Sequence, residues 1–149
     1  MARYVDGVKG YPTPWSPREA FFYAAGQVHH PYQDYSMRCD GFVGRCYGWA
    51  ASGEQSAIIH WYDIPWQRRH RLGTPPAGAL VFWNVGRYGH VALADGHGNV
   101  FSNDIKRAGK IDRVPQSLIT RNWGAKYLGW ANPVFPKGSG RNPDAKPVL

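Results

Sequence analysis

The sequence predicts a single α+β domain in which helices come first along the chain and an antiparallel sheet follows. Three observations predict this class. Helix start and stop signals cluster before Pro76, and short apolar runs bounded by glycine or proline follow it. Strands and helices do not alternate, as they would in a parallel sheet. The 149 residues, 43% of them hydrophobic, are enough to bury one core.

The first helix has the clearest start signal. Ser16-Pro17-Arg18-Glu19 combines a capping box with proline at the first helical position. Alanine and aromatic residues continue the helix, and Gly26 is expected to end it. The residues before Ser16 include two prolines and are expected to be irregular.

Two further helices are expected before Pro76. The second should begin between 36 and 38 and end at about Tyr47, just before a glycine. Ser52 is expected to cap a third helix over 54–62. A basic loop over 65–76 then leads to the strands.

The rest of the chain is expected to form the sheet. Apolar, β-rich runs predict strands over 79–83, 89–94, 99–105, 110–114 and 127–131. A glycine-containing turn over 95–98 should fold the second of these strands back onto the third. These elements predict one domain over 1–136. Residues 137–149, rich in glycine, proline and charge, are typical of a flexible tail or a cut linker.

The chain is basic, with 18 Lys and Arg against 10 Asp and Glu, a net charge of +8. This charge favours an anionic partner. It is scattered, however, and the sequence carries no nucleic-acid-binding motif, so no nucleic-acid partner is expected. The seven Trp and nine Tyr would suit stacking on sugar rings. No window approaches the roughly 18 apolar residues of a membrane span. We expect a monomer without a membrane span.

Cys39 is the candidate nucleophile. It opens the second helix, where unpaired N–H groups and the positive end of the helix dipole favour the thiolate, the nucleophilic form. Cys46, in the middle of that helix, is expected to be a buried structural thiol. The two cysteines lie about 10.5 Å apart along one helix, beyond the roughly 7 Å limit on the Cα separation in a disulfide. Both are therefore expected to be free.

His90 is the candidate base, because it follows Gly89 at the mouth of a strand, where a substrate can come close. A thiol–imidazole pair also needs a third group that orients the ring. Asp104 is the preferred orienting residue, with Asn103 in reserve. A hairpin with a simple, even-numbered loop would put Asn103 opposite His90, whereas an odd loop or a bulge would turn Ser102 and Asp104 toward it.

Metal and cofactor sites are not expected. A zinc site needs three or four ligands at a recognisable spacing, and the scattered histidines and two cysteines show none.

Four motifs, in this order, resemble the NlpC-type and CHAP-type cell-wall peptidases and amidases, over roughly 35 to 104. They are Cys39-Asp40-Gly41-Phe42-Val43, Gly78-Ala79-Leu80-Val81-Phe82-Trp83, Gly89-His90-Val91-Ala92-Leu93 and Gly96-His97-Gly98-Asn99-Val100. The resemblance implies a papain-like fold, in which N-terminal helices carry the nucleophile at a helix N-terminus and pack on a C-terminal antiparallel sheet that carries the base. The NlpC-type motif has Asp before the cysteine and Ser after it, whereas this chain has Arg38 and Asp40.

The resemblance also implies the residue roles. Cys39 would be the nucleophile and His90 the base. Aligned without gaps, the family's third polar residue falls on Ser102, with Asp104 two residues further along the same face. We therefore prefer Asp104 as the third residue.

The function implied is hydrolysis of an amide bond in peptidoglycan, by a stem-peptide endopeptidase or an amidase, through a thioester. The partner would then be peptidoglycan in an anionic cell wall. Two alternatives are a cysteine-dependent toxin, deamidase or protease that acts on a protein, and a non-catalytic basic and aromatic wall-binding module. Because the start of the chain lacks the apolar segment of a secretory signal, we expect a cytoplasmic enzyme released by lysis, as a phage endolysin is, or a trimmed secreted domain.

Overall fold

The computed structural model describes residue 8 and residues 10–148. In this part of the chain the fold is α+β, with an open antiparallel sheet of six strands and four α-helices. The helices are α1 (Pro17–His29), α2 (Cys39–Cys46), α3 (Ala57–Asp63) and α4 (Gln116–Trp123), with a 3-10 turn η1 (Trp66–Arg68). The strands are β1 (Arg69–His70), β2 (Leu80–Asn84), β3 (His90–Ala94), β4 (Asn99–Asn103), β5 (Ile111–Pro115) and β6 (Lys126–Ala131), and their order in the sheet is β1-β6-β2-β3-β4-β5.

The predicted capping box starts α1. The Ser16 hydroxyl accepts a hydrogen bond from the Glu19 N–H (3.1 Å), and the Ser16 N–H donates to the Glu19 carboxylate (2.8 Å). Gly26 does not end this helix as the sequence predicts. The helix continues to His29, because the buried side chain of Gln27 extends the inward face by another turn.

The second helix begins at Cys39, directly after the predicted interval, and the third is shorter than predicted. Ser56, not Ser52, caps α3, and its hydroxyl accepts from the Ile59 N–H (3.3 Å). Ser52 is used elsewhere, since its hydroxyl donates to the carboxylate of Asp40 (2.7 Å). None of the helices described is long and apolar enough to cross a membrane.

Five strands match the predicted runs, and the described structure adds three elements that the sequence did not predict: η1, β1 and α4. β1 forms within the basic loop, as a two-residue edge strand paired with β6. α4 lies between β5 and β6, and it lacks a side-chain cap at its start. β4 ends at Asn103 because Asp104 adopts a left-handed conformation (φ 59°), which extended strands do not use.

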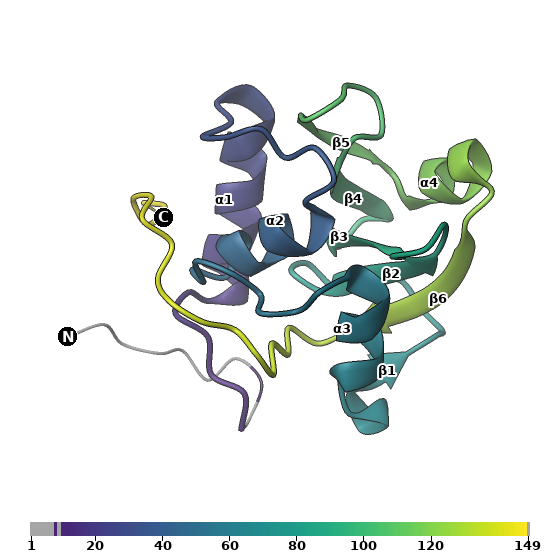
Figure 1. The fold of residues 1–149 in the computed structure, drawn as a ribbon, viewed down its shortest axis with the longest axis horizontal. Helices are drawn as coiled ribbons and strands as arrows, with labels where there is room; N and C mark the ends of the chain where they lie inside the picture. Colours follow the sequence, from purple (N-terminus) through teal and green to yellow (C-terminus); the bar gives the residue numbers. More distant parts are fainter. Residues whose placement is uncertain (1–7, 9, 149) are drawn as a thin grey trace.

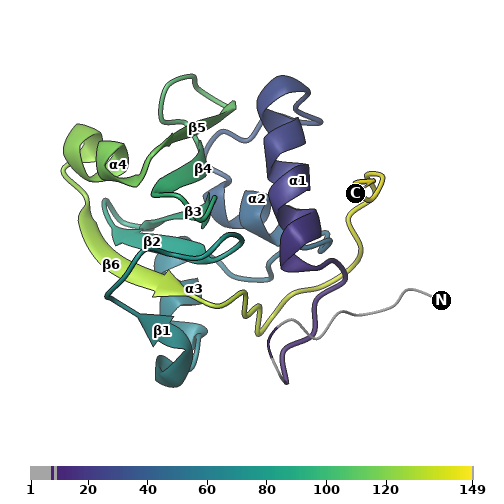
Figure 2. The ribbon, with the colours of Figure 1, turned by 180° about the vertical axis from the view of Figure 1, so that it is seen from behind.

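The helices cover the two faces of the sheet unequally (Figures 1 and 2). α1, α2 and α3 pack on one face, against β5, β3 and β2 respectively. α4 covers the other face, where Ile119 belongs to an apolar cluster with residues of β2, β3, β4 and β5. Successive side chains of β3 alternate between these faces, so that Val91 points to the α2 face and Ala92 to the α4 face. His90 lies on the α4 face, against Trp123.

The segment predicted to be a tail packs on the domain. After β6 the chain runs back past α2 toward α1, drawn in yellow in Figure 1. The side-chain amide of Asn142 donates to the Arg45 carbonyl (2.9 Å), and the Lys146 ammonium lies 2.7 Å from the Glu19 carboxylate. The packed unit therefore extends at least to Lys146.

Candidate active site

A cavity of about 770 Å³ lies where α2 and β3 begin and β4 ends. Four of the residues that the sequence singles out border this cavity: Cys39, His90, Asn103 and Asp104. The structure therefore gathers the candidate chemistry in one place. Ser102 lies behind the wall, fully buried.

Cys39 is the first residue of α2 and is half-buried, whereas Cys46 is fully buried. Both are free thiols, as predicted. The Cys39 sulfur faces the backbone N–H of Val91, the residue after His90, and those of its own helix start. The start of α2 therefore places the thiol beside the beginning of β3.

The N–H groups of the helix start favour the thiolate, as expected, but burial outweighs their effect. Burial raises the pKa of the Cys39 thiol to about 12, and the charge of Asp40 adds to the rise. Hydrogen bonds from backbone N–H groups, that of Val91 first, act in the opposite direction but do not outweigh burial. The thiol is thus protonated at neutral pH, and a base must take its proton before it attacks.

His90 is held by a chain of two hydrogen bonds. Its Nε2 lies 2.8 Å from the Ser102 hydroxyl, and that hydroxyl donates its one proton to the Asn103 carbonyl (3.0 Å). The hydroxyl must therefore accept from Nε2–H. This assigns the proton to Nε2 and leaves the lone pair on Nδ1, the arrangement that a general base needs.

The imidazole of His90 is neutral as well as oriented. The edge of the ring contacts Trp123, with centroids 4.7 Å apart and planes at 89°, and Trp83 lies behind it at 5.9 Å. Burial lowers the pKa of His90 to about 3. The resting site therefore holds a neutral thiol and a neutral imidazole, and no hydrogen bond joins these two groups in the part of the chain described.

The strand register determines which polar side chains share the face of His90. Ala94 pairs with Val100, so the odd-numbered set of residues 95–99 lies between the last paired positions. This is the odd-loop alternative, which was expected to turn Ser102 and Asp104 toward His90. The ring donates its Nε2–H to Ser102, on which the resemblance alignment places the family's third polar residue, and has no contact with the preferred Asp104 among the hydrogen bonds of the described residues.

Asp104 has a different set of contacts. Its carboxylate accepts from the backbone N–H groups of Met37 (2.8 Å) and Gly109 (2.6 Å). Met37 has a left-handed backbone (φ 58°), so this contact holds the strained turn that leads into α2. Asn103 donates to the Tyr35 carbonyl (2.7 Å) in the same turn, and its Oδ1 is buried without a hydrogen-bond partner.

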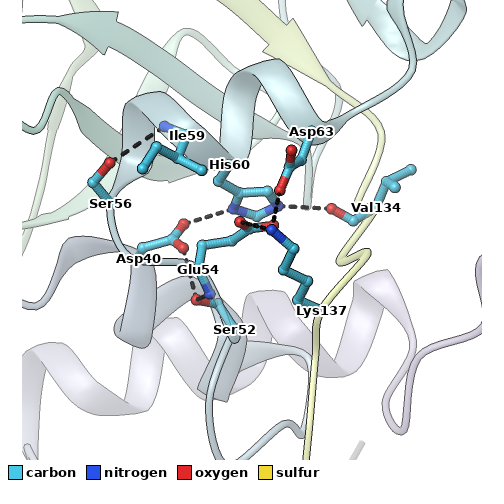
Figure 3. A network of polar contacts seen from close by, with 9 residues as sticks. All are labelled: Asp40, Ser52, Glu54, Ser56, Ile59, His60, Asp63, Val134 and Lys137. Carbon is cyan, nitrogen blue, oxygen red and sulfur yellow. Dashed lines mark hydrogen bonds and ion pairs between the residues drawn. The ribbon is translucent and has the colours of Figure 1, made fainter.

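Beside the thiol lies a charged network, centred on the buried His60, that sequence reasoning missed (Figure 3). His60 of α3 is fully buried, with its Nδ1 2.6 Å from the Asp40 carboxylate and its Nε2 2.8 Å from the Val134 carbonyl. Ser52 donates to the other Asp40 oxygen. The carboxyl groups of Glu54 and Asp63 and the ammonium of Lys137 complete the network on the other side of the ring.

His60 cannot be the base of a reaction in the cavity, because both of its nitrogens are occupied and its ring is inaccessible. Nor does the network form a metal site. Within the described residues, no group of three or more His, Cys, Asp or Glu side chains could hold a metal ion.

Comparison of the chain with family models, with curated proteins and with solved structures gives no match. The function must therefore be argued from the site itself.

Proposed function

We propose that this protein is a thiol-dependent amide hydrolase of peptidoglycan, with Cys39 as nucleophile, His90 as base and Ser102 as the residue that orients the base. One observation carries the proposal. A cavity holds both a cysteine at a helix start and a histidine whose Nδ1 lone pair is freed by the Ser102 hydrogen bond. This pairing of nucleophile, base and orienting group is the general requirement for nucleophilic catalysis.

The proposed reaction begins with a proton transfer. His90 Nδ1 takes the thiol proton while the Cys39 sulfur attacks the amide carbonyl. The carbonyl oxygen becomes an oxyanion, and backbone N–H groups at the start of α2 would stabilise it. The His90 imidazolium then protonates the departing amine, and the C–N bond breaks to leave a thioester. Water, deprotonated by His90, hydrolyses the thioester and restores the thiol.

The proton transfer requires a side-chain rotation. In the structure the thiol lies on the α2 face and faces the Val91 N–H, whereas the His90 ring lies on the α4 face, against Trp123. Because a change of χ1 at His90 would break the hydrogen bond of its Nε2 to Ser102, we assign the rotation to Cys39, at the start of α2. Catalytic hydrogen bonds are often formed only when substrate is bound.

Peptidoglycan is proposed from the resemblance to NlpC-type and CHAP-type enzymes and from the charge. A net charge of +8 suits an anionic wall. The cavity border also carries two aromatic side chains, the half-exposed Tyr88 and the Trp123 that packs on the base. Such rings can stack on a sugar.

The test is a digest of purified peptidoglycan followed by mass spectrometry of the soluble products. The wild type should release fragments with one new amine and one new carboxyl group, and Cys39→Ala should release none. Cys46→Ala is the matched control, because that thiol is buried away from the cavity, and it should keep the activity. Wall digestion by Cys39→Ala at the wild-type rate would refute the proposal, and cleavage of protein substrates alone would favour a toxin or protease.

A further inference from the structure

We infer that His60 is a buried imidazolium that, through Asp40, holds the first turn of α2 and balances the carboxylate charge beside the Cys39 thiol. The inference rests on the proposed function for its catalytic meaning, but its geometry stands alone. It makes His60 a positioning residue for the nucleophile, 21 positions away in the sequence.

The protonation state follows from the partners of the ring. The Val134 carbonyl can only accept, so Nε2 must carry a proton (2.8 Å). The Asp40 carboxylate accepts from Ser52 at one oxygen and faces Nδ1 at the other (2.6 Å), so Nδ1 must donate as well. An imidazole that donates from both nitrogens is cationic.

The surroundings of the ring agree with a cation. The groups that face it are Asp40 from α2, Glu54 from the loop before α3, Asp63 from α3 itself, and Lys137 from the C-terminal segment (Figure 3). Burial alone would lower the pKa of His60, but the charge and hydrogen bond of Asp40 raise it above its ordinary value. The rings of Phe82 and Phe135 close the remaining sides, at 5.4 and 5.2 Å between centroids.

Asp40 links this cation to the nucleophile. It directly follows Cys39, and its negative charge disfavours the thiolate. The same charge would oppose an oxyanion at the start of α2. With a cationic His60 on its far side, Asp40 belongs to a neutral pair. The pair also ties α2 to α3 and, through Val134, to the chain after β6.

A first test reads the charge of His60 directly, without a variant and without a substrate. In the ¹⁵N and ¹H NMR spectra of the wild type, His60 should show two ring N–H protons and the shifts of an imidazolium at pH 8. The exposed His97 serves as the internal reference in the same spectra. A single ring proton on His60, or a neutral ring at pH 8, overturns the inference.

A second test measures the effect on the thiol. The rate of alkylation of Cys39 by iodoacetamide, followed by mass spectrometry below the thiol pKa, is proportional to the thiolate fraction. His60→Gln should slow alkylation about tenfold, the equivalent of one unit in the thiol pKa. His60→Gln with Asp40→Asn restores charge balance and should return the rate to within about twofold of the wild type.

A merely structural role gives the opposite sign. If His60→Gln only loosened the packing around α2, the thiol would be more accessible and would react faster. A faster or unchanged rate therefore overturns the inference, and thermal melts of each variant establish that the folded protein is measured. His97→Gln is the control for loss of a histidine. Because alkylation needs no substrate, activity that survives Cys39→Ala would refute the proposed function while leaving these two tests valid.

Discussion

Ser102→Ala tests the assignment of the third residue most directly. The Ser102 hydroxyl is fully buried, accepts from His90 Nε2–H (2.8 Å) and donates to the Asn103 carbonyl (3.0 Å). The substitution leaves one buried donor and one buried acceptor without partners, each at a cost of about 1–3 kcal/mol. Part of that cost lowers the stability of the fold. The other part raises the activation free energy, because the His90 ring no longer has a fixed tautomer. If about 1.4–2.8 kcal/mol falls on the transition state, kcat/KM drops by about tenfold to a hundredfold.

The assay for Ser102→Ala is the rate of fragment release from purified peptidoglycan, divided by the fraction of folded enzyme measured by circular dichroism. Asp104→Asn is the comparison, because Asp104 contacts the backbone of Met37 and Gly109 instead of the ring. Its rate per folded molecule should stay within about threefold of the wild type. A full rate for Ser102→Ala together with a hundredfold loss for Asp104→Asn would refute the reasoning and restore Asp104 as the orienting residue.

Three further predictions concern pH and backbone conformation. Trp123→Ala should admit water to the His90 ring and raise its pKa from about 3 toward the ordinary value. The acid limb of the pH profile of kcat/KM should therefore move to higher pH. An acid limb at the wild-type pH would contradict this prediction. Burial and a hydrogen bond with Asp63 raise the pKa of Glu54 from 4.5 to about 7. The folded state therefore holds a proton that the unfolded state releases, and this stabilisation, complete below pH 4.5, is lost as the pH rises through 7. In urea titrations between about pH 5 and 8, the unfolding free energy of Glu54→Gln should fall less than that of the wild type, by about 1–3 kcal/mol. The control variant Asp34→Asn should show the same fall as the wild type. Gly53→Ala places a Cβ 1.8 Å from the Lys137 carbonyl oxygen at φ 79° and should lower the unfolding free energy by about 2 kcal/mol or more. Its control is Gly73→Ala, at φ 81° in open space, which should lower it by only about 1 kcal/mol. Equal melting temperatures for the two variants would count against the packing described.

The elements that local sequence could predict are those with local causes. The Ser16 capping box and the alternating residues of β3 depend on neighbours within a few positions, and both form as predicted. β1 and α4 have no such signal. β1 is two residues long and exists because β6 lies beside it, and Pro115 precedes α4 without a side-chain cap.

The site was only partly predictable for the same reason. Cys39 and His90 stand out in short motifs, but the choice of Ser102 depends on the odd loop after β3. That loop is set by Asp95, whose carboxylate accepts from the N–H groups of His97 and Asn99. His60 gave no signal at all, because its partners lie 20 and 74 positions away in the sequence.

The packed C-terminal segment determines where this domain can be joined to another. A fusion made after Pro136 would remove Lys137 from between Glu54 and Asp63, and would leave two carboxyl groups facing each other beside His60. It would also remove the Asn142 contact with α2 and the Lys146 contact with α1. A recombinant partner should therefore be attached beyond Lys146, because residues 137–146 act as a strap that ties the helix carrying the thiol to the rest of the molecule.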